Sequence, residues 1–390
     1  MHFLAACCQA RIIVGLTDLL DRRMVATMAV RVPSLQVLPA EPNGSVDALA
    51  PNRPLLPLDH GIVDGMARRV RYLRISVTDR CNYRCSYCMP DSEASGVEFG
   101  ARSELLTFEE IEQIATVFAG LGVRKIRLTG GEPTIRVGIV DLVRRLAKVP
   151  GIAQVVMTSN GHLLDELATP LAQAGLRGVH VSLDSLDADK FRRLTGRGDL
   201  TKVQAGIAAA ASAGILQGIN TVALQSENAN EILNLCEFAW RHGAIPRFIE
   251  HMPMSSGAFY DASQQLSAVQ IRQTIAAAFG ELAPAANKLP DGGPARYWVT
   301  PGGRQVGVIS AMTEHFCDDC NRLRLTAAGG LHACLGYDDS ISLRDILRNG
   351  GDQSALHNAI AQSITGKRPG HGFESTGVGG PTKHMISVGG

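Results

Sequence analysis

The chain has 390 residues, is 45% hydrophobic and 5% aromatic, and carries a formal net charge of +1. This length and composition are typical of a folded α/β protein with one long domain or two domains. The near-neutral charge excludes a global attraction to nucleic acid or to an anionic membrane, so local basic residues must hold any anionic ligand. The longest apolar stretch, residues 205–216, is too short to span a bilayer and predicts an alanine-rich helix.

Residues 1–63 are expected to form an N-terminal extension outside the folded part of the chain. Its first residues are apolar, but they lack a basic segment, and Asp18 and Asp21 argue against a transit peptide. Six of the 18 prolines lie between residues 33 and 57, and no periodicity is sustained there. That composition predicts a linker or a disordered arm.

From about residue 69, short apolar segments alternate with helical patterns. The segment Thr107-Phe-Glu-Glu110 is a capping box, which marks a helix start. Repeated strand-then-helix units predict parallel strands joined by crossover helices, here an open, partial (β/α)6 barrel of TIM type. In such barrels the site lies at the carboxyl ends of the strands. The expected strands are 72–77, 125–129, 154–158, 178–183, 218–224 and 247–249, and the expected helices include 107–121 and 137–147.

Three cysteines follow the first strand at the spacing C-x3-C-x2-C: Cys81, Cys85 and Cys88. Three thiolates can hold three irons of a [4Fe–4S] cluster and leave the fourth iron open to a small molecule. A structural zinc site and redox thiols are the alternatives, but zinc normally takes four protein ligands, and a redox pair would not need Cys81. The chain has nine cysteines and no secretory signal, which favours metal sites in a reducing compartment over disulfides.

Small polar motifs end the next three strands. In Gly130-Gly131-Glu132, the glycines let the backbone approach a ligand closely, and the carboxylate can accept a hydrogen bond from an ammonium group. Thr158 and Ser182 can bind a ribose or a carboxylate, or they can serve as turn residues and helix caps. Their repeated position at strand ends favours a ligand site.

After about residue 255 the alternation stops, and glycine-proline motifs predict a smaller C-terminal region with hairpins. A hairpin over residues 322–335 would return Cys334 to Cys317 and Cys320. These three thiolates can hold a second iron–sulfur cluster or a zinc ion completed by His315 or His332.

Two arginines follow the second cysteine group directly. Arg322 and Arg324 alternate with leucines, so both project to one face of a strand. Such alternation usually indicates a solvated face. Beside a cluster ligand, however, the two arginines suit a polyanionic or guanine-bearing substrate.

Together these motifs resemble the radical S-adenosylmethionine (radical SAM) superfamily. Within it, residues 64–390 are similar to the GTP 3′,8-cyclase family (molybdenum cofactor biosynthesis protein A), which performs the first step of molybdenum-cofactor (molybdopterin) biosynthesis. The resemblance implies a barrel of radical SAM type over 64–290 and a C-terminal region over 291–390 with a second cluster and a Gly-Gly tail reaching the active site. The segments that carry it are residues 73–82, 127–133, 247–250, 293–297, 316–326 and 389–390.

The resemblance also implies two [4Fe–4S] clusters and S-adenosylmethionine as cofactors, with the two cysteine groups facing each other across a cavity. The first group would bind the cluster that cleaves S-adenosylmethionine, and the second would bind a cluster whose open iron contacts the guanine of GTP. The implied contacts to S-adenosylmethionine are Gly130, Gly131, Glu132, Thr158, Ser182 and Tyr87. The implied contacts to GTP are Arg74, Lys125, Arg247, Arg322 and Arg324.

The implied reaction begins with a 5′-deoxyadenosyl radical that removes hydrogen from C3′ of GTP. The C3′ radical then attacks C8 to give 3′,8-cyclo-7,8-dihydro-GTP. The implied partners are a reductase or flavodoxin-type electron donor and the downstream cyclic pyranopterin monophosphate synthase, in the cytoplasm. Neither nucleic acid nor membrane is expected to bind, and a homodimer is left open.

Two other functions remain open from the sequence. One is a radical SAM enzyme with an auxiliary cluster that acts on a peptide, although such enzymes usually carry more C-terminal cysteines than the three here. The other is an inactive paralogue, because Gly218 stands where members of the cyclase family commonly have lysine.

Overall fold

The computed structural model describes residues 62–89, 99–286, 292–374 and 376–389. All of these residues belong to one compact unit of the chain. Apart from Ile62 and Val63, the predicted N-terminal extension lies outside the described residues, as do Cys7 and Cys8.

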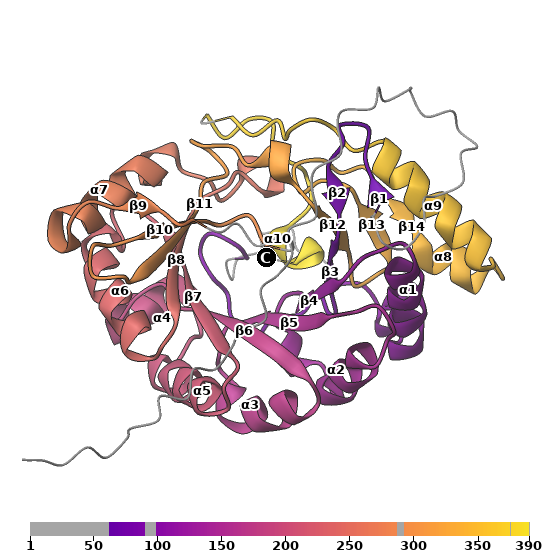
Figure 1. The fold of residues 1–390 in the computed structure, drawn as a ribbon, viewed down its shortest axis with the longest axis horizontal. Helices are drawn as coiled ribbons and strands as arrows, with labels where there is room; N and C mark the ends of the chain where they lie inside the picture. Colours follow the sequence, from indigo (N-terminus) through magenta and orange to yellow (C-terminus); the bar gives the residue numbers. More distant parts are fainter. Residues whose placement is uncertain (1–61, 90–98, 287–291, 375, 390) are drawn as a thin grey trace, which may run out of the picture. The chain divides into compact units, whose positions relative to one another are not determined.

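The six predicted strands form the centre of a single curved sheet, so the predicted α/β barrel architecture is confirmed (Figure 1). These strands pair in parallel and in chain order, and their helices lie on the outer side of the sheet. The strands are β3 Tyr72–Ser76, β4 Lys125–Thr129, β5 Gln154–Ser159, β6 Leu176–Ser182, β7 Leu216–Ala223 and β8 Ile245–Glu250. The helices are α1 Phe108–Gly120, α2 Ile139–Ala147, α3 Leu164–Gln173, α4 Ala188–Thr195, α5 Leu200–Ser212 and α6 Ile232–Arg241.

Helix α1 begins at the predicted capping box. The Thr107 side chain accepts a hydrogen bond from the Glu110 N–H, and the Glu110 carboxylate accepts one from the Thr107 N–H at 2.8 Å. Together these two bonds satisfy amide donors that the first helical turn leaves unpaired. Ile111, Ile114 and Phe118 then recur at helical spacing and are fully buried against the sheet.

The apolar stretch 205–216 is not one helix, which corrects the expectation for that segment. Helix α5 ends at Ser212, and Gly214 takes a left-handed conformation with φ of 70°. Strand β7 begins at Leu216. The turn needs a residue that tolerates positive φ, and glycine is the residue that does so at least cost.

The C-terminal hairpins extend both edges of the same sheet. Strand β12 pairs in parallel with β3, and β11 pairs in parallel with β8, so eight consecutive strands run parallel. The strands of two to four residues beyond them pair antiparallel. These strands are β9 Ala283–Pro284, β10 Arg296–Val299, β11 Gln305–Ile309, β12 Arg322–Leu325, β13 Gly330–His332 and β14 Ile341–Ser342.

The predicted hairpins have no core of their own. Val306, Val308, Leu323 and Leu325 are fully buried and belong to the main hydrophobic core of the barrel. A short hairpin buries too little apolar surface to be stable alone, which explains why both hairpins dock on the barrel edges.

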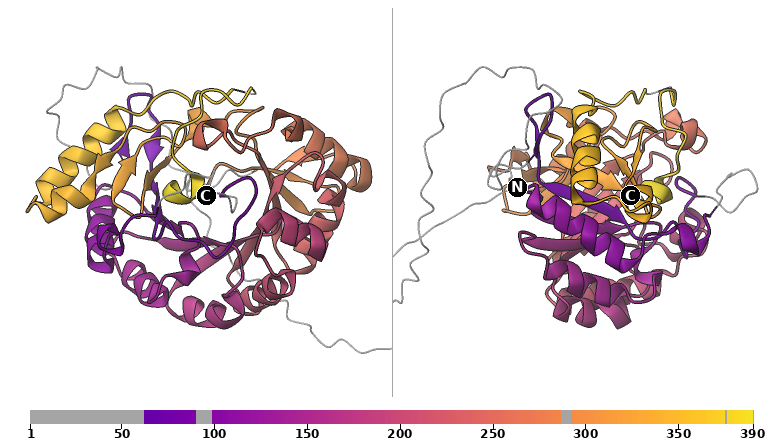
Figure 2. Two further views of the ribbon diagram at one scale, coloured as in Figure 1. Left: turned by 180° about the vertical axis from the view of Figure 1, so that it is seen from behind. Right: turned by 90° about the vertical axis from the view of Figure 1, so that its right-hand side faces the viewer.

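The remaining elements cover the ends and one side of the barrel. Helices α8 and α9 pack against α1, on the side where β12 joins the sheet (Figure 2). The last helix, α10, lies inside the curve of the sheet (Figure 1). No helix within the described ranges is long and apolar enough to cross a membrane. The elements are β1 Ile62–Val63, β2 Arg69–Val70, α7 Ala268–Phe279, α8 Leu343–Arg348, α9 Gln353–Thr365 and α10 Met385–Val388.

Glu250 ties the end of β8 to two neighbouring segments. Its fully buried carboxylate accepts hydrogen bonds from the N–H groups of Ala268, Met312 and Thr313 at 2.8, 2.7 and 2.9 Å. The Thr313 hydroxyl donates a further bond. One side chain therefore accepts the hydrogen bonds of backbone amides both at the start of α7 and in the loop after β11.

We expect Glu250→Ala to lower the free energy of unfolding of the apo chain by about 3 kcal/mol, because one buried and two partly buried backbone amides lose their acceptor. Urea unfolding followed by circular dichroism measures the change. Glu281→Ala, at an exposed position, is the matched control and should change nothing. A loss below about 1 kcal/mol for Glu250→Ala would contradict this role.

Candidate functional site

A cavity of about 840 Å³ occupies the inside of the barrel. Thirteen of the seventeen predicted site residues line it: Arg74, Cys81, Cys85, Tyr87, Cys88, Lys125, Gly130, Gly131, Glu132, Thr158, Ser182, Arg247 and Arg324. Arg322 and the second cysteine group are not among its described lining residues. The structure therefore brings the first cysteine group, the strand-end motifs and the basic residues to one cavity.

The loop of the first cysteine group is anchored on the end of helix α4. The N–H groups of Arg84 and Ser86 donate to the carbonyls of Thr195 and Leu194 at 2.8 and 2.9 Å. All three cysteines of the loop are free thiols. Burial raises the pKa of Cys81 to about 11, with Glu132 adding to the rise.

The third cysteine of that loop behaves in the same way. Burial raises the pKa of Cys88 to about 12, and the nearby Cys81 adds to it. Three half-buried thiols that resist ionisation are a poor redox centre alone, whereas a bound cationic metal group favours their thiolate forms. The donor set therefore fits an iron–sulfur cluster.

The spacing of the cysteines bears on the zinc alternative. Thiolates on one tetrahedral zinc ion lie about 3.8 Å apart. In neither cysteine group of the described chain do three ligand atoms fall within 4.8 Å of one another. Spacing this wide argues against a single ion held by three cysteines and is compatible with a polynuclear cluster.

Gly130 and Gly131 pack directly against the first cysteine loop. The Gly131 N–H donates to the Thr78 carbonyl at 2.8 Å. A Cβ atom at Gly130, where φ is 145°, would lie 2.5 Å from the Thr78 carbonyl oxygen, and one at Gly131 would lie 2.2 Å from the Arg80 carbonyl oxygen. Only glycine allows the end of β4 to approach the loop this closely.

The carboxylate of Glu132 braces the ends of β4 and β5. It accepts hydrogen bonds from the Thr134 N–H and hydroxyl at 2.9 and 2.6 Å, from the Ser159 hydroxyl at 2.8 Å and from the Asn160 N–H at 2.6 Å. Burial raises its pKa, and these donors oppose the rise. Its contact with an ammonium group stays a prediction.

The other predicted cofactor contacts, Tyr87, Thr158 and Ser182, also lie in the cavity wall, and two of them are hydrogen-bonded to neighbouring side chains. The Tyr87 hydroxyl donates to Asp184 Oδ2 at 2.5 Å, just after β6. Burial raises the pKa of Asp184 to about 6, although this hydrogen bond opposes the rise. The Thr158 hydroxyl accepts a hydrogen bond from Arg127 at 2.9 Å, and Ser182 is half-buried in the cavity wall.

Strand register gathers the basic residues into two rows across three strands. Arg324 of β12 pairs with Arg74 of β3, which pairs with Arg127 of β4. One row away, Arg322 pairs with Tyr72, which pairs with Lys125. Because side chains two residues apart share a face of a strand, both rows project to the same side.

Positive charge dominates the cavity at these rows. Burial lowers the pKa of Arg74 well below its usual range, and the charge of Arg324 adds to this effect. Burial also lowers the pKa of Arg247, whose Nε atom is buried without a hydrogen-bond partner. Crowded, desolvated cations are unfavourable alone and are stabilised by a bound polyanion.

Tyr72 lies among these cations. Arg127 Nε donates a hydrogen bond to its hydroxyl. Burial opposes ionisation, but Arg127, Arg74 and Lys125 outweigh it and lower the pKa of Tyr72 to about 7. The anionic tyrosinate is therefore accessible near neutral pH, which marks how strongly positive the cavity is.

The second cysteine group sits around the β12–β13 hairpin, as predicted. Cys317 and Cys320 precede β12, and Cys334 follows β13. Burial raises the pKa of Cys320, but Arg322 and Lys367 outweigh it and bring the value down to about 6. The buried ammonium of Lys367 lies 3.4 Å from Cys320 Sγ and donates to the Arg322 carbonyl at 2.8 Å.

The two histidines predicted as alternative zinc ligands differ in position. His315 lies close to Cys317, whereas His332 Nδ1 lies 3.0 Å from the Lys383 ammonium. A zinc ion completed by His332 is therefore not supported.

Several site residues were missed by sequence reasoning. Residues two apart on a strand share one face, and this rule was applied only to Arg322 and Arg324. Applied to the neighbouring strands, it could also have found Tyr72 and Arg127. Lys367 had no such signal, because it is 47 positions from Cys320.

A parallel barrel with a three-cysteine loop after its first strand defines a radical SAM enzyme, which uses S-adenosylmethionine and an iron–sulfur cluster. The Radical SAM superfamily matches residues 75–239, and Molybdenum Cofactor Synthesis C matches residues 245–373. Within that class, the chain belongs to the GTP 3′,8-cyclase family.

Several relatives carry that name, and two of them illustrate the match. The GTP 3′,8-cyclase of Caulobacter vibrioides is 43% identical over 336 residues, which cover 84% of this chain and 94% of the relative. That of Rhizobium etli is 42% identical over 339 residues, covering 85% and 94%. Among solved structures, SuiB of Streptococcus suis, bound to the precursor peptide SuiA, matches with a TM-score of 0.55 and 14% identity, covering 77% of this chain and 67% of SuiB. That likeness shows the fold alone.

We expect Tyr72 to ionise near pH 7 in the ligand-free protein, seen as a step in tyrosinate absorbance between pH 6 and 8. The step should vanish in Tyr72→Phe and persist in the control Tyr337→Phe. Because the folded pKa lies below the unfolded value of about 10, the stabilisation is complete above pH 10 and is lost as pH falls through about 7. An unchanged step in Tyr72→Phe would contradict the assignment.

Proposed function

We propose that the chain cyclises GTP to (8S)-3′,8-cyclo-7,8-dihydroguanosine 5′-triphosphate, the first step of molybdenum cofactor biosynthesis. One observation carries the proposal: a single cavity joins the first cysteine loop to crowded, buried cations. A nucleoside triphosphate matches that arrangement, because its phosphates can neutralise the cations while its ribose extends toward the radical-generating loop. The relatives named GTP 3′,8-cyclase support the same substrate.

In the proposal, Arg74, Lys125 and Arg247 hold the triphosphate. The planar guanidinium groups can each pair with two phosphate oxygens, which gives orientation as well as affinity. Arg127 is added to this set, because it lies in register with Arg74 and its Nε already contacts the Tyr72 hydroxyl. Bringing the triphosphate among these groups replaces mutual repulsion with attraction.

The polar strand ends hold the cofactor in the same proposal. Tyr87, Gly130, Gly131, Glu132, Thr158 and Ser182 would surround S-adenosylmethionine beside Cys81, Cys85 and Cys88. When bound, the cofactor and cluster supply the radical that removes the C3′ hydrogen of GTP. The barrel wall then has to hold C3′ and C8 close together and keep water out.

The C-terminal tail contributes to that enclosure. Arg324 Nη1 donates to the Val388 carbonyl at 3.3 Å and also to the Gly389 carbonyl. A Cβ atom at Gly389, where φ is 76°, would lie 2.2 Å from the Thr129 methyl group. The tail therefore needs glycine to fit beside β4, and we infer that it helps close the cavity.

A second [4Fe–4S] cluster at Cys317, Cys320 and Cys334 is part of the proposal. The buried Lys367 supports it, because a lysine only 4% exposed needs an anionic partner and its ammonium lies against Cys320. Arg324 links this group to the cavity, since the charges of Cys320 and Cys334 raise its pKa against the lowering by burial. With Arg324 in this position, the guanine of GTP would lie between the second cluster and the triphosphate site.

Neither alternative function is favoured. The fold likeness to peptide-bound SuiB carries no substrate information at 14% identity. The glycine at position 218 is compatible with an active site, because a Cβ there would lie 2.9 Å from His180 Cδ2 and 3.2 Å from Arg247 Cδ. These two side chains occupy the space, and Arg247 brings a cation to it.

The proposal also includes partners that follow from the reaction. A reductase or flavodoxin-type donor would supply electrons, and a cyclic pyranopterin monophosphate synthase would consume the product. The seven described cysteines are free thiols, which supports a reducing compartment such as the cytoplasm.

The reduced, cluster-loaded protein is expected to convert GTP and S-adenosylmethionine to the cyclised nucleotide and 5′-deoxyadenosine, measured by mass spectrometry. Arg247→Met should lower kcat/KM for GTP about 100-fold, since a charged contact to substrate contributes about 2–3 kcal/mol. Arg304→Met, on the outer surface beside Trp240, is the control and should keep full activity. Absence of both products with two intact clusters would refute the function.

Lys367→Met is expected to lower the midpoint potential of the second cluster. The positive charge and hydrogen bond of Lys367 stabilise the reduced, more negative state of the cluster, and the variant lacks both. A redox titration followed by electron paramagnetic resonance separates the two clusters, and the first should not shift. Lys367→Arg should restore the potential in part, and exposed Lys202→Met should leave it unchanged. An equal shift of both clusters would contradict a local effect of Lys367.

A further inference from the structure

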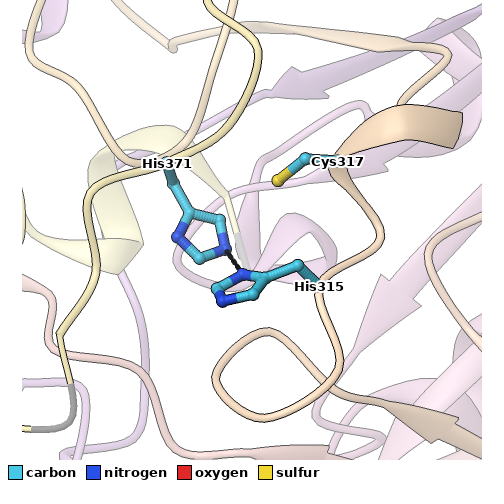
Figure 3. A group of neighbouring side chains, drawn as sticks. All are labelled: His315, Cys317 and His371. Atoms are coloured by element: carbon cyan, nitrogen blue, oxygen red, sulfur yellow. Dashed lines mark hydrogen bonds between the residues drawn. The ribbon is translucent and has the colours of Figure 1, made fainter.

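Three metal-ligating side chains converge beside the second cysteine group. His315, Cys317 and His371 bring one ligand atom each within 4.8 Å of one another (Figure 3). His315 Nδ1 lies 3.1 Å from His371 Nε2. Within the described ranges, no other three histidine, cysteine or carboxylate side chains meet this spacing.

The spacing matches one small ion rather than a cluster. A tetrahedral zinc ion has bonds of about 2.0–2.1 Å to nitrogen and about 2.3 Å to sulfur, so its ligand atoms lie about 3.3–3.8 Å apart. Because the three ligand atoms already lie within 4.8 Å of one another, side-chain shifts of at most about 1.5 Å bring them to that distance. Two borderline imidazoles and one soft thiolate favour zinc over the hard cations magnesium and calcium.

The backbone on both sides of the group is held in place. Arg68, in an ion pair with Asp64 at 2.6 Å, donates to the carbonyls of Cys317 and Pro369 at 2.9 and 3.0 Å. The Tyr337 hydroxyl donates to the Gly370 carbonyl at 3.0 Å. The segment that carries His371 is thus tied to the turn that carries Cys317, so the three ligands meet without a large rearrangement.

Solvent can supply the fourth ligand. His315 is exposed, whereas Cys317 and His371 are half-buried. An ion can therefore enter from the surface and keep one position for water, which is the pattern of an open zinc site.

We propose that, before the second cluster is assembled, His315, Cys317 and His371 hold one Zn²⁺ ion. Because Cys317 also belongs to the proposed cluster, the two occupants exclude each other, and bound zinc blocks assembly of the second cluster. The zinc site itself stands on the triad geometry, and only this competition rests on the proposed function. Cys320 and Cys334 take no part in the site, and Cys320 is instead engaged by Lys367.

The test uses the full-length apo chain in a background that removes competing thiols: alanine at Cys7, Cys8, Cys81, Cys85 and Cys88. Zn²⁺ affinity is measured by competition with a chromophoric chelator. His315→Ala and His371→Ala should each weaken binding by at least about 100-fold, since even outer-shell changes weaken metal affinity about 10–100-fold. Cys334→Ala is the matched control and should leave the affinity unchanged.

Co²⁺ substitution gives a second readout, because thiolate-to-cobalt absorbance counts the bound sulfurs. One thiolate is expected, and it should disappear in Cys317→Ala. Retained zinc affinity in both histidine variants, or its loss in Cys334→Ala, would overturn the site in favour of binding by the three cysteines. Circular dichroism of each variant verifies that lost affinity does not come from unfolding.

The competition is tested in the chain with its native cysteines. Zinc loading before reconstitution should halve the iron content from about eight to about four per chain, because each [4Fe–4S] cluster holds four irons. In His315→Ala, the iron content after reconstitution should be the same with and without prior zinc loading. Equal zinc inhibition in both chains would overturn the competition. A protein that binds zinc as described yet makes no cyclised nucleotide would refute only the cyclase function.

Discussion

Repulsion among buried cations is the constraint on which the site depends. Arg74 and Arg247 are at most 8% exposed, and burial lowers the pKa of each. A sheet whose backbone groups are paired along every central strand can impose this unfavourable grouping, because the side chains cannot separate without breaking the ladder. In the proposed function this repulsion is relieved when the anionic triphosphate enters, so the free energy lost in the empty site becomes binding energy.

The C-terminal strands complete the proposed nucleotide site. Strand β12 places Arg324 beside Arg74 in register, and the tail folds back so that the same guanidinium contacts the Val388 carbonyl. The hairpin thus contributes Arg324 to the basic row, and Arg324 in turn anchors the C-terminal tail. Strand β12 therefore serves both stability and the site, because Leu323 and Leu325 pack in the core and Arg324 lines the cavity.

The two cysteine groups differ in their electrostatic surroundings at one position, Cys320. Around Cys81 and Cys88, burial raises the pKa of the thiols, whereas Arg322 and Lys367 bring the pKa of Cys320 down to about 6. Local charge and hydrogen bonds tune iron–sulfur potentials, so equal ligand sets need not give equal clusters. The histidines beside the second group further separate its metal chemistry from that of the first.

The sequence by itself determined the six central strands, the start of α1 at Thr107 and the cysteine loop, because strand alternation, capping and ligand spacing are local properties of the chain. It left undecided where the hairpins dock, and it misjudged residues 205–216, where one glycine at position 214 ends the helix early. Only the tertiary structure decided that Lys367 meets Cys320 and that His371 meets Cys317. These pairs are 47 and 54 positions apart, and their contact depends on packing that joins distant segments, which no local pattern encodes.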